Sequence, residues 1–239
     1  MSPRSHEEKN NDKVEGRPAT VSVRMHLSRQ HLFSAIHFTR LAKRIEHDEN
    51  PEDLSGDLRT EYLAVITAAV ILSVAAVEAS ANDLWADAFD AAQSRPVHRF
   101  NGTSPGLALK LRELWPEVER ASILEKYEAA LKAAGKEPYN RGVEPFQPMS
   151  HLIDLRNALV HFFPEWDTAQ DKHENLKQML KYRFEPSPFA MEEDEWFPKK
   201  CLGYGCAAWA VGTSATFIDD FLHRLEMDSW VAAHLDQLR

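Results

Sequence analysis

Three polar side chains that could do chemistry lie within six residues of one another, at Arg156, Asn157 and His161. An imidazole titrates near neutral pH and can give or take a proton, whereas a guanidinium can hold an anion through two parallel hydrogen bonds. Asn157 and His161 are four residues apart, so they point to the same side of an α-helix. The spacing therefore predicts a polar cluster that binds an anion and moves a proton.

The helix expected to carry this cluster runs from Met149 to Phe163 and is ended by Pro164. Its apolar residues recur at helical spacing and form one face, which we expect to pack against the core. That face comprises Leu152, Leu155, Leu159, Phe162 and Phe163. The polar cluster projects to the opposite side of the helix, where it can meet a ligand.

A second apolar feature of the same helix predicts a homodimer. Asp154 is expected close to Asn157 and His161, and an apolar edge lies between this group and Arg156. The edge consists of Ile153 and Val160. It lies outside the core face and would be exposed unless a partner covers it. A two-fold axis at this edge would bring two copies of the cluster into one cleft.

Such a cleft could cut the phosphodiester bond of RNA without a metal ion or cofactor. His161 would take or give a proton, Arg156 would hold the phosphate, and Asn157 would orient the reacting group. The nucleophile would be the 2′-OH of the RNA itself. RNA is therefore the expected substrate.

The segment Asp154-Leu155-Arg156-Asn157-Ala158-Leu159-Val160-His161 resembles the motif of the HEPN superfamily (higher eukaryotes and prokaryotes nucleotide-binding). Ribonucleases of that family carry an Arg, then four to six residues, then a His on a late helix. The commonest form has a polar residue directly after the Arg, as Asn157 is here. The resemblance implies an α-helical bundle, a dimeric active unit and a metal-independent endoribonuclease of toxin–antitoxin, phage-defence or RNA-processing systems.

An earlier segment, Val77–Trp85, is similar to the Glu-x-x-x-Asn helix of several HEPN subfamilies through Glu78 and Asn82. The resemblance then covers about residues 57–225, and Glu78 and Asn82 would support the same cleft. Their alternative role is that of a hydrogen-bonded pair within an apolar helix. One HEPN subset has a Tyr two residues after the His, where a partner nucleotidyltransferase modifies it. Phe163 stands there, so an antitoxin of that kind is not expected.

Composition is that of one folded domain. The 239 residues are 44% hydrophobic and 27% charged, which suits a single globular core. A net charge of −9 argues against a protein that coats long nucleic acid, although a local basic pocket stays compatible with it. Cys201 and Cys206 have no flanking metal ligands, so neither a disulfide framework nor a zinc site is expected. A reducing, cytoplasmic location follows.

The pattern of apolar residues predicts an all-α protein, a helical bundle of HEPN type with extra flanking helices. Residues 1–20 are expected to be a disordered polar tail and 21–239 a single helical domain with its HEPN core at about 57–225. Helices are expected over 28–47, from 53 or 57 to 92, and over 107–115, 116–134, 149–163, 168–184 and 206–225, with a short tail helix after them. The charge-free stretch 62–77 is too short to span a bilayer, so we expect a buried central helix and no membrane contact.

Other functions remain open at this point. Arg156 and His161 could be surface residues near a helix C-terminus, where the helix dipole favours cations. The chain could then be a non-catalytic helical module that binds a nucleotide, an antitoxin or another protein partner. A metal hydrolase is disfavoured, because no His, Asp or Cys cluster has the spacing of a metal site.

Overall fold

The structure is a computed structural model that describes residues 24–50, 55–93, 97–104, 106–163 and 173–231. Every regular element within these ranges is helical and none is a strand, which confirms the prediction of an all-α fold. The expected polar tail at residues 1–20 lies outside the described residues.

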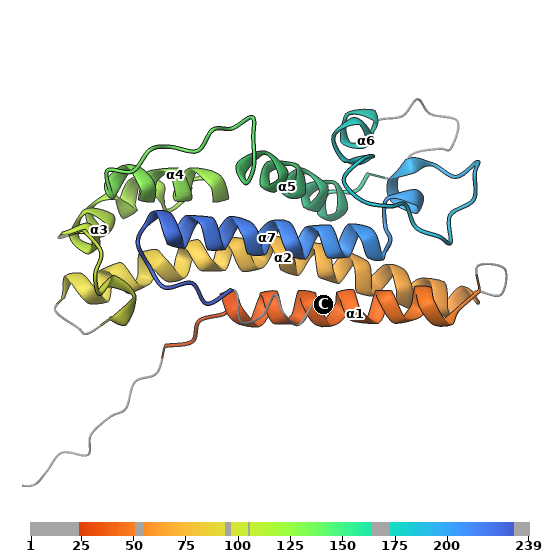
Figure 1. Cartoon of the computed structure of the whole chain (residues 1–239), viewed down its shortest axis with the longest axis horizontal. Coiled ribbons are helices and arrows are strands. Elements are labelled where there is room, and N and C mark those ends of the chain that lie inside the picture. The colour runs from red at the N-terminus through yellow and green to blue at the C-terminus, as the bar shows by residue number, and fades with distance from the viewer. Residues whose placement is uncertain (1–23, 51–54, 94–96, 105, 164–172, 232–239) are drawn as a thin grey trace, which may run out of the picture.

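Three long helices form the base of the molecule: α1 (Ser28–Asp48), α2 (Gly56–Ala92) and α7 (Tyr204–Arg224). The chain runs along α1 in one direction and returns along α2, and α7 packs against both (Figure 1). The Ser55 hydroxyl begins α2 by accepting a hydrogen bond of 3.2 Å from the Leu58 N–H. Small residues then recur along α2, so its neighbours can approach it closely.

By length and apolar composition alone, α2 could cross a membrane, but other helices bury half of its most apolar window. Its contacts are with α1, α7 and three helices described below. That surrounding matches the expected central helix of a bundle. The core helix of a globular protein passes the same length and composition test.

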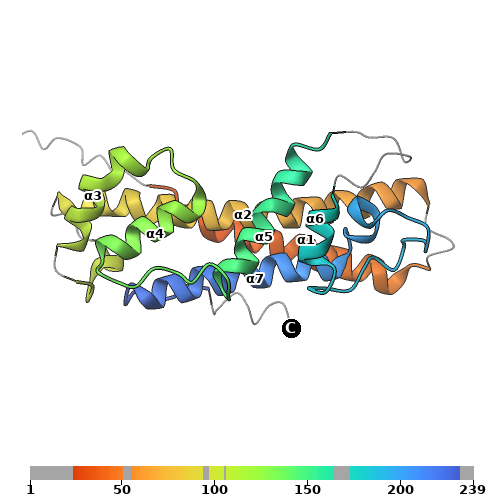
Figure 2. The ribbon, with the colours of Figure 1, turned by 90° about the horizontal axis from the view of Figure 1, so that it is seen from above.

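The remaining helices cover α2 from the side opposite to α1. The short turn η2 (His98–Phe100) leads to α3 (Leu107–Val118) and α4 (Ile123–Ala133), which pack on the C-terminal half of α2. Figure 2 shows α5 (Phe146–Val160) lying obliquely across α2 and α7. Next to α5 lies α6 (Glu174–Leu180), and an irregular turn, η3 (Trp196–Lys200), precedes α7.

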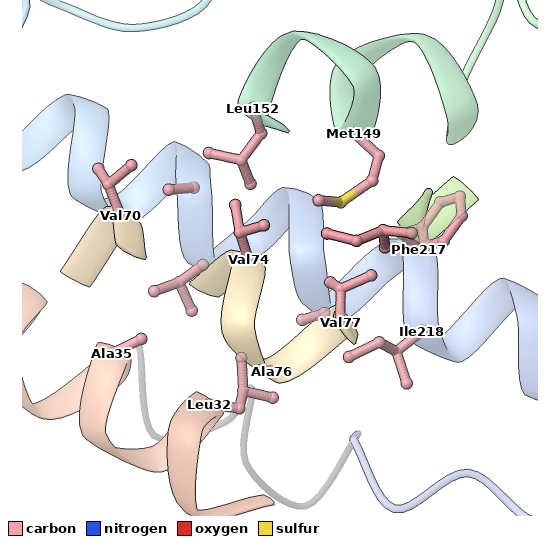
Figure 3. Packing of buried hydrophobic residues seen from close by; sticks show 14 of the residues in the cluster. Leu32, Ala35, Val70, Val74, Ala76, Val77, Met149, Leu152, Phe217 and Ile218 are labelled. Atoms are coloured by element: carbon pink, nitrogen blue, oxygen red, sulfur yellow. The ribbon is translucent and has the colours of Figure 1, made fainter. Parts of the chain in front are cut away.

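Apolar side chains from four helices meet where α5 crosses α2. Met149 and Leu152 of α5 point down toward Val74 and Val77 of α2, with Phe217 of α7 beside them (Figure 3). Both α5 side chains are fully buried. This contact fixes the position of α5, the helix that carries the predicted polar cluster.

Two predicted boundaries around α3 and α4 were wrong. Pro116 was expected to open the second of these helices, but it lies inside α3, which continues to Val118. The true start of α4 is a capping box, in which the Ser122 hydroxyl accepts from the Glu125 N–H and the Glu125 carboxylate accepts from the Ser122 N–H. The Ser-x-x-Glu pattern at Ser122 therefore marks the start of α4, and Pro116 does not.

Two further predicted helices differ from expectation, one in its position and the other in its length. The helix expected over 149–163 begins three residues earlier, at Phe146, and ends at Val160. The helix expected over 168–184 is only α6, from Glu174 to Leu180, and residues 164–172 lie outside the described ranges.

Cys201 and Cys206 are buried free thiols that contact each other, and burial raises the pKa of the Cys201 thiol.

The substitution Leu152→Ala should destabilise the protein by about 2–5 kcal/mol, because it leaves a cavity between α5 and α2. The exposed Val160→Ala on the same helix should cost less than about 0.5 kcal/mol. Urea unfolding followed by circular dichroism measures both values. Equal values for the two variants would contradict the packing of α5 described above.

Candidate functional site

The end of α5 places the predicted catalytic histidine outside regular helix. Val160 is the last helical residue, and His161 is the C-cap, with φ −106° and ψ 32°. The His161 N–H still donates to the Asn157 carbonyl, at 2.9 Å. His161 and Asn157 are both exposed and are one turn apart, so these two predicted site residues are presented together at the surface.

Arg156 is half-buried, and its Nε is enclosed without a hydrogen-bond partner. No carboxylate among the described residues forms an ion pair with this guanidinium. The terminal nitrogens of the guanidinium are not enclosed and make no hydrogen bond with the described residues, so an anion that reaches them gains a strong, charge-assisted hydrogen bond. Arg156 thus has the free donors that phosphate binding requires.

Asp154 extends the polar group along α5 toward a residue that the sequence analysis did not select, His151. Partial burial raises the pKa of the Asp154 carboxyl, and His151 opposes that rise. Burial also lowers the pKa of the His151 imidazole, with a further contribution from the charge of Arg183. His151 precedes Asp154 by three residues and His161 by ten, and this helical spacing puts the three residues near one face of α5. The same spacing in the sequence could have identified His151 as a member of the group.

Glu78 and Asn82 are not joined to this group. Neither makes a hydrogen bond or ion pair with Arg156, Asn157 or His161. Glu78 is half-buried on α2, one turn beyond the Val74 contact with α5. Asn82 is exposed, and its side-chain carbonyl instead accepts a hydrogen bond of 3.1 Å from Lys126 of α4.

The alternative that Glu78 and Asn82 form a buried, hydrogen-bonded pair is wrong for the same reason, since Asn82 pairs with Lys126. Asn82 lies eight residues from Val74, about 12 Å along the helix axis. Of the two supporting residues, Glu78 is therefore the one near the crossing of α5 over α2.

Apolar residues precede and follow His161 in the chain at the end of α5. Val160 is 51% exposed, Phe162 47% and Phe163 67%. The prediction that both phenylalanines lie on the core face was wrong, because the helix ends before them and the chain leaves the helical path. Phe162 instead packs beside the rings of His173 and Phe197, with centroid separations of 6.3 and 6.2 Å.

The predicted apolar edge of α5 is only half present. Ile153 packs partly buried against the core, while Val160 is exposed. The exposed apolar surface is therefore made by Val160, Phe162 and Phe163, at the end of the helix rather than along its side. His161 lies within this sequence of residues, so a partner that covers it would also enclose the imidazole.

Metal chemistry has no visible support in the residues that the structure describes. No group of three or more His, Cys, Asp or Glu side chains lies close enough together there to hold a metal ion. The polar group on α5 instead combines a guanidinium, which binds anions, with a carboxamide, a single carboxylate and imidazoles, which can transfer protons.

The chain matches no protein-family model, no curated protein and no solved structure. Its own residues are therefore the basis for a functional inference.

Replacing His161 by Ala should change the free energy of unfolding by less than about 0.5 kcal/mol, because the side chain is exposed and its backbone hydrogen bond is retained. Asn157→Ala should behave in the same way. Thermal melting of the two variants beside the parent measures the effect. A large loss of stability in either would indicate a structural role for these side chains.

Proposed function

We propose that this protein is a metal-independent endoribonuclease of HEPN type that cuts RNA by attack of the 2′-OH, acting in phage defence, a toxin–antitoxin pair or a stress response. The observation that carries the proposal is the unpaired guanidinium of Arg156 on α5, five residues before the exposed imidazole of His161 at the C-cap of that helix. A cytoplasmic location and an antitoxin or other protein partner belong to the same proposal.

In the proposed reaction, neutral His161 takes the proton of the 2′-OH as the 2′-oxygen attacks the adjacent phosphorus. The bond to the 5′-oxygen breaks, and that oxygen receives a proton from a protonated imidazole, supplied by the second copy of the chain. The products are a 2′,3′-cyclic phosphate and a 5′-OH end. Arg156 stabilises the charge that develops on the phosphate oxygens, and the Asn157 carboxamide orients the reacting group.

The exposed apolar end of α5 supports the dimer that this mechanism needs. Val160 and Phe163 flank His161 and expose half or more of their side chains. A second copy packed on this surface would bury them and bring two sets of Arg156 and His161 into one cleft. A supporting role of Glu78 in that cleft belongs to the same proposal.

A second candidate function is a non-catalytic HEPN-like helical module that binds a nucleotide or a protein partner. The same apolar surface at Val160, Phe162 and Phe163 favours it, because such a surface can bind a partner whether or not RNA is cut. Catalysis by Arg156 and His161 is what distinguishes the two candidates.

The decisive experiment compares cleavage of a structured RNA, and growth arrest on expression, in Arg156→Ala and His161→Ala. Each should lose about 10²–10⁴-fold in rate, because a proton-transfer group or a phosphate-binding charge is removed. The controls Arg112→Ala and His47→Ala remove an exposed Arg and an exposed His from other helices and should cut as the parent does. Activity of the parent should persist in EDTA.

The ribonuclease proposal fails if both site variants cut RNA as the parent does, or if the parent cuts no RNA tested. A parent that needs a divalent ion restored after EDTA belongs to another mechanistic class. Loss of cleavage in the site variants at an unchanged melting temperature is the supporting outcome.

The protein should be a homodimer in solution, and Val160→Asp should shift it toward monomer, because a charge would be buried in the interface. Leu109→Asp is the matched control, since Leu109 is also half exposed but lies on α3. Light scattering at several concentrations measures the masses. A strictly monomeric parent at high micromolar concentration would exclude the composite cleft.

A further inference from the structure

A hollow of about 520 Å³ opens on the surface between α2, α3 and α4, away from the polar group on α5. Its volume lies in the range of sites that bind small molecules, about 300–1,000 Å³. It is lined by Arg24, Asn82, Trp85, Phe89, Trp115 and Lys126, with Ala86 and Glu119 completing its wall. Arg156, Asn157 and His161 do not line this hollow.

Three aromatic rings line the hollow. The ring centroids of Trp85 and Trp115 are 5.9 Å apart, and Phe89 meets Trp115 edge to face at 6.4 Å. Trp85 is almost fully buried, and its Nε1 has no hydrogen-bond partner. Trp115 and Phe89 are half-buried, so part of each ring faces the space that a ligand would fill.

Lys126 brings an uncompensated cation to these rings. The residue is only 7% exposed, and its Nζ donates to the Asn82 carbonyl at 3.1 Å and lies 5.7 Å from the centroid of Trp115. Within the described part of the chain, no carboxylate forms an ion pair with it. A buried ammonium held by one neutral acceptor and a ring leaves donors unused.

Two other charged side chains line the hollow, and neither is a counter-ion for Lys126. The Arg24 guanidinium is a second cation, and it already has partners in Asp90 at 2.7 Å and the Ala86 carbonyl at 2.9 Å. Glu119 is exposed and makes no ion pair with Lys126. The hollow therefore combines aromatic walls with one buried positive charge that lacks its counter-ion.

We propose that this hollow binds a small planar aromatic molecule that carries one anionic group, a carboxylate or a phosphate. The anion would bind the Lys126 ammonium, and the planar body would pack against Trp115 and Phe89. The side-chain carbonyl of Asn82 positions the ammonium by accepting a hydrogen bond from it. The site is separate from the polar group on α5, so it can be occupied whether or not RNA is cut there.

The test is isothermal titration of the full-length protein with three naphthalene probes. 2-Naphthoate and 2-naphthyl phosphate carry the anion, and 2-naphthamide is their neutral analogue. At least one of the two anions should bind at one site per chain about tenfold or more tighter than the amide, as a charge-assisted hydrogen bond in a partly buried site provides. Comparing the two anions then identifies carboxylate or phosphate as the preferred group.

Variants locate the binding site. Lys126→Met keeps most of the length of the unbranched side chain but removes the charge, and it should abolish the preference for the anions over the amide. Lys132→Met, an exposed lysine on the same helix outside this hollow, should bind all three probes as the parent does. Asn82→Leu changes an exposed residue and should weaken anion binding several-fold in a folded protein, even if Lys126→Met does not fold.

The proposal is overturned if no probe binds, if the amide binds as tightly as both anions, or if anion binding is unchanged in Lys126→Met and Asn82→Leu. Equal weakening of anion binding in Lys132→Met and Lys126→Met would place the probes elsewhere and also overturn it.

Discussion

Burial of the long apolar helix α2 is the constraint on which the other elements depend. A helix of 37 residues is about 55 Å long, and no single neighbour can cover it. The chain therefore places α1 and α7 along its length, α3 and α4 over its C-terminal half, and α5 across its middle. Residues far apart in sequence are brought together around this helix, and α5 takes its position from contacts with α2 and α7.

Polar contacts join α2 to its neighbours toward both of its ends. Toward its start, Glu46 of α1 accepts hydrogen bonds from the Tyr62 hydroxyl and the Tyr204 N–H, and burial together with Glu46 raises the pKa of Tyr62. Toward its end, Asp87 is paired with Arg99 at 3.3 Å. Burial raises the pKa of Asp87, and Arg99 opposes the rise. Polar pairs thus add to the apolar packing of α2 toward both ends of the helix.

Periodicity predicted the all-helical fold and the buried role of α2, because an apolar repeat reports directly on which face is covered. It failed where the outcome depended on how a helix ends. Pro116 is a helix-start signal only when no better cap follows, and Ser122 supplies one. Phe162 continues the apolar pattern but lies past the last helical residue. Asn82 and Lys126 are 44 residues apart and lie on different helices. Helical spacing within one segment cannot reveal a hydrogen bond between two such residues.

The position of His161 at the C-cap of α5 has an entropic consequence for the proposed catalysis. Terminal turns of helices fray, and the amide of His161 rests on a single bond to the Asn157 carbonyl. Ordering a frayed residue has a free-energy cost, and this cost lowers the net free energy of the binding that orders it. A free chain would hold its imidazole in many orientations, whereas a partner packed on Val160 and Phe163 would select one. Association of two copies would then act as the on-switch, with catalytic rate following protein concentration more steeply than first order.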